Sequence, residues 1–368
     1  MRLSILSSFF AFIRAGLWET EVQPSQINGC ELSQLYKLAQ EQCVVGLIAA
    51  GLEHITDRRF SKIETLSIVG EALQLEQRNL AMNHFIGVIV EKLRSAGIYT
   101  LLVKGQGIAQ CYERPLWRAC GDVDFYLSKS NYERAKEFLA PLASSFEPED
   151  KRRLHYGMTI DSWVVELHGT MHTGISRKMN KVSDEIHYDV FYKGNVRSWN
   201  NQGVQVFLPS PDNNVVIVFN HIIDHFYGEG IGLRQVCDWC RLLWTCRNEI
   251  DLQLLESRIK KAGLLTEWKA FGTFAVEYLG FPLDAMPFYY KSTTYSKKAQ
   301  KICSLILESG NFGHNKDNSY RVKSSPMKSN IITFLVRLKE FSRISTIFPT
   351  NAPKFFINYV IDRAKAAF

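Results

Sequence analysis

The sequence predicts an α+β protein, with a small mixed sheet in the middle of the chain and helical segments on either side of it. Two short apolar runs rich in strand-forming residues lie close together at 98–103 and 121–127, whereas helix-spaced apolar residues dominate before residue 96 and after residue 211. A chain of 368 residues has room for two or three domains and an ample core. We expect an N-terminal helical segment, a sheet-containing core, a helical domain and a basic amphipathic C-terminal segment, at residues 1–69, 70–208, 209–320 and 321–368.

Composition and the N-terminal residues indicate a cytoplasmic protein. Hydrophobic residues make up 46% of the chain and charged residues 22%, values typical of soluble domains. No apolar run approaches the length of a transmembrane helix. Residues 1–15 are apolar like a signal peptide, but Arg14 occupies the position of the cleavage site, so we expect a first helix. The eight cysteines are scattered through apolar contexts, which favours reduced thiols in the cytoplasm over a disulfide framework.

Two helical regions are predicted before the first strand. Residues 31–52 are expected to form one helix, or two joined near Gly46. Residues 63–96 predict a long amphipathic helix that packs across the sheet and ends at Gly97. Its apolar residues recur at intervals of three and four, as at Met82, Phe85, Ile89 and Leu93.

A glycine turn follows the first predicted strand. The strand at 98–103 leads through Lys104-Gly105-Gln106-Gly107 into a short helix at 108–112. Glycine permits backbone conformations that other residues resist, and the N–H groups at the start of a helix are available to an anion. The turn therefore has the features of a phosphate-binding element.

The second strand carries two aspartates. Asp122 and Asp124 are two residues apart on the strand at 121–127, so their side chains point to the same face. Adjacent carboxylates repel, and each is costly to bury without a counter-charge. The pair predicts a divalent-metal site, and two solvated carboxylates at a strand end are the alternative.

A hairpin is predicted at 154–159 and 161–168. In its second strand Glu166 and His168 share one face, which we assign to the metal side. Asp161, five residues before Glu166, is expected on the opposite face.

The remaining segments are mainly helical after residue 211. Residues 144–153 are predicted to be a polar loop, and 169–208 to be irregular with two aromatic segments, 187–192 and 204–208. Asp212 is expected to cap the helix that follows. Helices are predicted at 131–140, 212–225, 232–246, 252–262 and 264–279.

The whole net charge of +7 lies in residues 321–368, because residues 1–320 are electrically balanced. The same segment contains the apolar runs 331–336 and 355–361. The pattern is compatible with weak contact to a nucleic acid or an anionic surface. It is also typical of helices packed on the body with a solvated outer face, which is the arrangement we expect.

Several short motifs follow one another in order: Lys104-Gly105, Arg118, Gly121-Asp122-Val123-Asp124-Phe125, the apolar-acid-apolar-His run at 163–168, Pro209-Ser210-Pro211, His221 and His225, and Gly232-Leu233-Arg234-Gln235-Val236-Cys237-Asp238. This ordered set resembles the uncharacterised nucleotidyltransferase family of the DNA polymerase β superfamily. The likeness runs from about Leu32 to the C-terminus. It implies a polymerase β-like nucleotidyltransferase core at 70–208, flanked by N-terminal helices and a C-terminal helical domain.

The resemblance implies roles for the site residues. Asp122, Asp124 and Glu166 would be the catalytic residues and would ligate two Mg²⁺ (or Mn²⁺) ions. The implied nucleotide-binding residues are Lys104, Gly105, Gln106, Arg118, Gly121 and His168. Lys104 offers a point charge to the triphosphate and Arg118 a bidentate fork, although Arg118 could equally brace its loop by pairing with an aspartate. Gln106 stands where better-studied members carry a serine hydroxyl, so phosphate binding would rely on Lys104 and backbone N–H groups.

The implied activity is transfer of a nucleoside monophosphate from an NTP to an acceptor hydroxyl or amine, with release of pyrophosphate. The acceptor (a protein side chain, a tRNA end, a sugar or a small molecule) and the base are left open. A rival from another class is a non-catalytic nucleotide-binding or scaffold protein that has kept the fold. The missing serine hydroxyl favours this rival, and the acidic triad opposes it.

Two other groupings contain the residue types of a zinc site. His221 and His225 are separated by four positions with Asp224 between them, an order that differs from the HExxH of zinc proteases. We expect them to form one polar helix face, and a zinc hydrolase is the more distant alternative. Cys237 and Cys240 form a CxxC without a second pair, which in a helical segment is typical of core residues.

Overall fold

Within residues 3–55, 60–228, 230–311 and 326–367, which the computed structural model describes, the chain folds around a seven-stranded mixed sheet. The strand order is β3-β4-β5-β2-β1-β7-β6. Strand β2 is parallel to β5 and β1 is parallel to β7, while the other neighbours are antiparallel. The α+β class is confirmed. The strands are β1 (Leu101–Val103), β2 (Asp122–Tyr126), β3 (Ser145–Phe146), β4 (His155–Ile160), β5 (Trp163–His168), β6 (Val196–Asn201) and β7 (Val204–Pro209).

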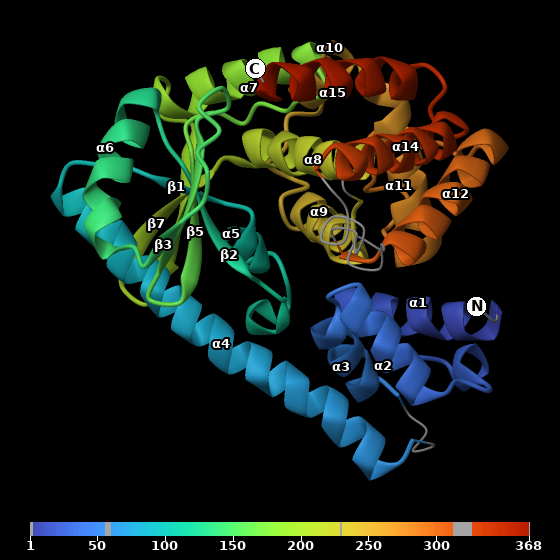
Figure 1. Cartoon of the computed structure of the whole chain (residues 1–368). Helices are drawn as coiled ribbons and strands as arrows, with labels where there is room; N and C mark the ends of the chain where they lie inside the picture. The colour runs from blue at the N-terminus through green and yellow to red at the C-terminus, as the bar shows by residue number, and fades with distance from the viewer. Residues whose placement is uncertain (1–2, 56–59, 229, 312–325, 368) are drawn as a thin grey trace.

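The long helix α4 (Lys62–Ser95) runs across one face of the sheet (Figure 1). Ser61 caps its start by accepting a hydrogen bond from the backbone N–H of Glu64, and Gly97, with φ of +68°, ends it. Its first half extends beyond the sheet toward the N-terminal helices (Figure 1). The helix predicted at 63–96 is confirmed, and its second half alone covers the sheet. The residues that it buries there are Met82, Phe85, Ile86, Ile89, Val90 and Leu93.

The N-terminal helices pack with the C-terminal helices into one core. Trp18 Nε1 donates to the Leu279 carbonyl at 2.6 Å, and Arg14 Nη1 donates to the Tyr278 carbonyl at 3.1 Å. Residues 31–52 form two helices, and the break between them lies at 42–44 rather than at Gly46. These N-terminal helices are α1 (Leu3–Trp18), the 3₁₀ turn η1 (Pro24–Ile27), α2 (Leu32–Glu41) and α3 (Val45–Glu53).

The other helices cover the sheet or form the body beside it (Figure 1). Between the strands of the sheet, in chain order, lie α5 (Gly105–Ala109), η2 (Pro115–Trp117), α6 (Lys129–Leu139), η3 (Ala140–Leu142) and α7 (Arg177–Phe191). The body contains α8 (Pro211–Tyr227), α9 (Leu233–Thr245), α10 (Leu252–Ala262), α11 (Leu265–Leu279), α12 (Thr293–Ser309), α14 (Pro326–Ser345) and α15 (Asn351–Ala367).

The segment 169–208 is more regular than predicted. It forms helix α7 and the hairpin of β6 and β7. The signal for α7 was present, because its buried apolar residues recur at intervals of three and four and pack on the helical body. Those buried positions are Met179, Val182, Ile186 and Val190.

Smaller corrections concern element ends and caps. Strand β1 begins at Leu101 rather than at residue 98, and α5 begins at Gly105 rather than at residue 108. Asp161 is not on β5 but in the tight turn before it, with φ of +48°, so its predicted strand phase was wrong. Asp212 does not cap α8: its side chain accepts from the backbone N–H of Asp251 at 2.7 Å, just before α10.

The C-terminal helices α14 and α15 pack on the body, as expected. Ile344 and Phe348 are buried, and the ring of Phe355 lies 4.7 Å from that of Tyr227 in an edge-to-face contact. Arg337 bonds to the Gly228 carbonyl and pairs with Glu340. Contact of this segment with a nucleic acid or an anionic surface stays a prediction. Part of its positive charge, at Arg321 and Lys323 and on the side chains of Lys328, Arg363 and Lys365, lies outside the described residues.

No described helix has the length and apolarity that crossing a membrane requires.

Candidate active site

Three carboxylates meet on two neighbouring strands. The parallel register of β2 and β5 places Asp124 opposite Glu166, and Asp122 lies two residues earlier on the same face. The alternating residues Val123 and Phe125 are buried under α4 on the other face, so a slip of one residue would bury the acids instead. One oxygen from each carboxylate lies within 4.8 Å of the others. The structure thus brings the three predicted metal ligands together.

Lys104 reaches this cluster from the turn between β1 and α5. Its φ is +56° and that of Gly105 is +37°, and a Cβ on Gly105 would lie 3.1 Å from Cys120 Sγ, so the turn requires glycine there. Lys104 Nζ lies 2.6 Å from Asp124 Oδ1. Burial by itself lowers the pKa of Lys104, but the carboxylates of the cluster outweigh it and raise the pKa. The ammonium stays charged and occupies a position where the carboxylates need a cation.

The three acids differ in how well the protein compensates their charge. The negative charge of Asp124, and then burial, raise the pKa of Asp122. Burial would also raise the pKa of Glu166, but hydrogen bonds from His155 and His168 outweigh it and lower the pKa. Asp122 is therefore the carboxylate with the least compensation, and a bound cation would relieve it most.

Two histidines of the β4–β5 hairpin cover the acids. His168 Nε2 lies 2.9 Å from Asp124 Oδ1 and 3.4 Å from Glu166 Oε2. His155 Nε2 lies 3.1 Å from the same Glu166 oxygen, and the two rings stack with centroids 4.7 Å apart. Sequence reasoning missed His155. The signal was present, since the predicted hairpin pairs its first strand with its second and the register sets His155 opposite His168.

His155, Glu166 and His168 also lie close enough together to hold an ion. Both Nε2 atoms point to the same oxygen of Glu166, so this group offers two nitrogens and one oxygen. Mg²⁺ and Mn²⁺ prefer oxygen ligands. The all-oxygen group of Asp122, Asp124 and Glu166 therefore suits a hard divalent cation better.

Arg118 is held by an aspartate. Its Nε and Nη2 lie 3.0 and 2.6 Å from the two carboxylate oxygens of Asp238 in α9, and both side chains are buried. The Tyr112 hydroxyl donates to the same carboxylate at 2.8 Å. Two roles were predicted for Arg118, and this contact corresponds to the second, in which the arginine braces its loop by pairing with an aspartate.

Gln106 and Gly121 lie away from the cavity. The Gln106 side chain is buried and donates to Asn79 Oδ1 at 2.7 Å, so it points toward α4. Gly121 is exposed just before β2. Neither lines the cavity, whereas Lys104, Gly105, Arg118 and His168 do.

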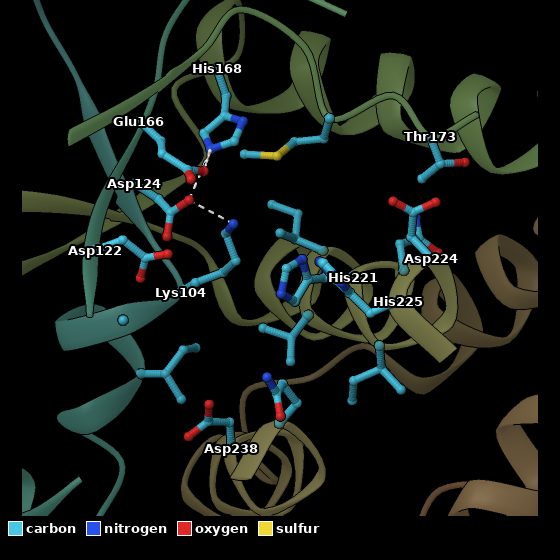
Figure 2. A pocket seen from close by; sticks show the side chains of 18 of the residues that line it. Lys104, Asp122, Asp124, Glu166, His168, Thr173, His221, Asp224, His225 and Asp238 are labelled. Carbon is cyan, nitrogen blue, oxygen red and sulfur yellow. Dashed lines mark hydrogen bonds and ion pairs between the residues drawn. The ribbon is translucent and has the colours of Figure 1, made fainter. Parts of the chain in front are cut away.

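Helix α8 forms the wall opposite the carboxylates, across a cavity of about 470 Å³. Figure 2 shows His221 facing Lys104 across this space, with Asp224 and His225 further along the helix. Burial, and then the charge of Lys104, lower the pKa of His221 well below its usual value, so the ring is neutral. The polar face predicted for this helix is a wall of the cavity. Among the described residues, His221 and His225 belong to no group of three potential metal ligands.

The CxxC of α9 is part of the core. Cys237 and Cys240 are fully buried, and within the described chain neither joins a group of metal ligands. Burial raises the pKa of both thiols, which opposes the thiolate form that binds zinc. All eight cysteines are free.

A comparison with models of known protein families shows to which family the chain belongs. The model of a family described as uncharacterised nucleotidyltransferase matches residues 28–280, which is more than half of the chain. The chain belongs to this nucleotidyltransferase family. The match covers the sheet, α8, α9 and every residue of the carboxylate cluster. It ends at Gly280, so the likeness expected to reach the C-terminus stops at the end of α11. No curated protein and no solved structure matches the chain.

Proposed function

We propose that the protein is a metal-dependent nucleotidyltransferase that moves a nucleoside monophosphate from an NTP to an acceptor hydroxyl or amine and releases pyrophosphate. The observation that carries this proposal is the convergence of Asp122, Asp124 and Glu166 on one wall of a cavity, within 4.8 Å of one another. Membership of a nucleotidyltransferase family supports the same reaction class.

The donor set fits Mg²⁺ or Mn²⁺. All three ligands are carboxylate oxygens, which hard divalent cations prefer, and Asp122 lacks a full counter-charge from the protein. When bound, such ions neutralise charge on the phosphates and make the acceptor easier to deprotonate. Asp122 and Asp124 would hold the ion of the nucleotide, and Glu166 with both would hold a second ion.

The residues of the chain have separate tasks in the reaction. An acceptor oxygen or nitrogen forms a bond to the α-phosphorus, and the bond from that phosphorus to the bridging oxygen of the β-phosphate breaks. The electron pair leaves with pyrophosphate. In this proposal Glu166, hydrogen-bonded to His155 and His168, would help to take the acceptor proton, and Lys104, beside Asp124, would neutralise the phosphates.

A non-catalytic nucleotide-binding protein remains the rival, because the turn has no hydroxyl and Gln106 faces the core. Incubation of the purified chain with each α-labelled NTP and Mg²⁺ or Mn²⁺ separates the two classes. We expect pyrophosphate and a labelled product on the true acceptor or on a surrogate (a hydroxyl-rich or amine-rich small molecule, tRNA, or the protein itself). NTP binding without turnover across that panel would favour the rival. The cytoplasmic location stays a prediction.

A further inference from the structure

One lysine and three arginines line the cavity beside the carboxylates, and they differ in their ion-pair partners. Lys104 is paired with Asp124, Arg118 with Asp238, and Arg153 with Asp150 and Asp362. The fourth cation, Arg234, makes no ion pair within the described part of the chain. An arginine beside a carboxylate cluster and without a carboxylate of its own is the cavity residue most available to an anionic ligand.

The guanidinium of Arg234 is only partly used. Nη1 donates to the Ala119 carbonyl at 2.5 Å, while Nε is buried without a hydrogen-bond partner. Arg234 lines the same cavity as Asp122, Asp124 and Glu166. A buried donor without a partner is costly, and a phosphate oxygen that reached this donor would satisfy it.

The start of α9 holds Arg234 firmly. The backbone N–H of Leu233 donates to Gln42 Oε1 at 2.9 Å, and Gln235 Nε2 donates to Asn311 Oδ1 at 2.9 Å. Gly232 packs so closely on Asn311 that a Cβ would lie 2.8 Å from Asn311 Oδ1. A rigid base under a flexible side chain suits a residue that must meet a ligand in one geometry.

We propose that Arg234 binds the terminal phosphates of the NTP and remains on the pyrophosphate as it leaves. The α-phosphorus must lie beside all three carboxylates, so the rest of the triphosphate extends toward a cation on one side of them. Lys104 stands within the cluster and Arg118 is committed to Asp238, which leaves Arg234 as the bidentate fork. This inference rests on the proposed function and names the residue that would contact the phosphates of its substrate.

The test uses the full-length protein and three variants. Arg234→Met removes the charge, Arg234→Lys keeps the charge but not the fork, and Arg247→Met is the matched control. Arg247 lies just beyond the other end of α9, over the ring of Trp244, and does not line the cavity. Affinities for Mn²⁺-loaded tripolyphosphate, pyrophosphate, NTP and NMP are measured by titration calorimetry, with thermal unfolding of each variant.

Arg234→Met should weaken tripolyphosphate, pyrophosphate and NTP binding by about ten- to a hundredfold, because a charge-assisted bidentate contact is lost. NMP binding should change less than about twofold, and the loss should be equal for all four bases. Arg234→Lys should recover only a small part of the affinity, and Arg247→Met should match the wild type.

Three outcomes would overturn the inference: unchanged tripolyphosphate affinity in Arg234→Met, equal loss for NMP and NTP, or full rescue by lysine. Full rescue would mean that one positive charge is enough and that Arg234 forms no bidentate fork on the phosphates. The proposed function is tested separately by turnover of the wild type. A wild type without turnover whose Arg234→Met variant loses tripolyphosphate binding would refute the reaction and support the phosphate contact.

Discussion

At the scale of the residue, the site is a balance between three carboxylates and a few cationic side chains. Asp124 accepts from both Lys104 and His168, while the pKa of Asp122 is raised by the charge of Asp124 and by burial. The two aspartates therefore have different consequences when replaced. Of the two aspartates, Asp124 is the one whose replacement would remove ion pairs, those with Lys104 and His168, from the metal-free protein.

Asp122→Asn should lower NTP turnover by about a hundredfold or more, because it removes a ligand of the cation that stabilises the transition state. The metal-free variant should melt at the same temperature as the wild type or slightly higher, since a repulsive charge has gone. Asp161→Asn, in the turn before β5, is the matched control and should change neither quantity. Equal turnover in Asp122→Asn and the wild type would refute the metal site.

Lys104→Met should strengthen Mn²⁺ binding to the nucleotide-free protein several-fold, because the ammonium competes with the ion for Asp124 Oδ1. The same variant should lose NTP turnover, because the phosphates lose their partner. Mn²⁺ affinity can be followed by electron paramagnetic resonance. Weaker Mn²⁺ binding in this variant would show that Lys104 supports the site instead of competing for it.

At the scale of the element, the β4–β5 hairpin holds the third acid. Its register stacks His155 on His168 and directs both toward Glu166. The hairpin thus delivers one ligand and the two groups that orient it, so a change in strand pairing would disrupt all three together.

The hairpin should make stability depend on pH. Burial by itself lowers the pKa of His168, but hydrogen bonds to Asp124 and Glu166 outweigh it and raise the folded-state pKa above the ordinary value of 6.5. A raised histidine pKa stabilises the fold fully below about pH 6.5, and this contribution is lost as the pH rises through the folded-state value. With chelator present, the melting temperature of the wild type should fall over this pH range more than that of the His168→Gln variant. Parallel curves for the two proteins would contradict the assignment.

At the scale of the whole molecule, the C-terminal helices complete the helical body. Phe355 is buried against Tyr227 of α8, the helix whose other face lines the cavity. The basic segment therefore supports the cavity wall, whatever else its exposed face contacts.

Removal of this segment should expose apolar surface. A chain that stops at Val322 should aggregate or melt at a lower temperature, and Phe355→Ala in the full chain should lower the free energy of unfolding by about 3–5 kcal/mol. Lys354→Ala, an exposed neighbour, is the control. A truncated chain that is equally stable but has lost binding to polynucleotide or lipid would instead make the segment a ligand-binding surface.

The sequence by itself determined the local parts of this protein. The long helix α4, the helix at 252–262 and the shared face of Asp122 and Asp124 follow from periodicity, which neighbouring residues set between themselves. The family motifs in addition pointed to Glu166 as the third acid, which the structure places beside the first two.

The tertiary structure alone decided which distant groups meet. Three features depend on how α9 and α4 pack against the sheet: the pairing of Arg118 with Asp238, the inward turn of Gln106 toward α4 and the position of Arg234 in the wall of the carboxylate cavity. No local pattern encodes such contacts, because they join residues far apart in the chain through packing that is settled only when the whole core forms. For the same reason the sequence left the role of Arg118 open, and the fold assigned its guanidinium to Asp238.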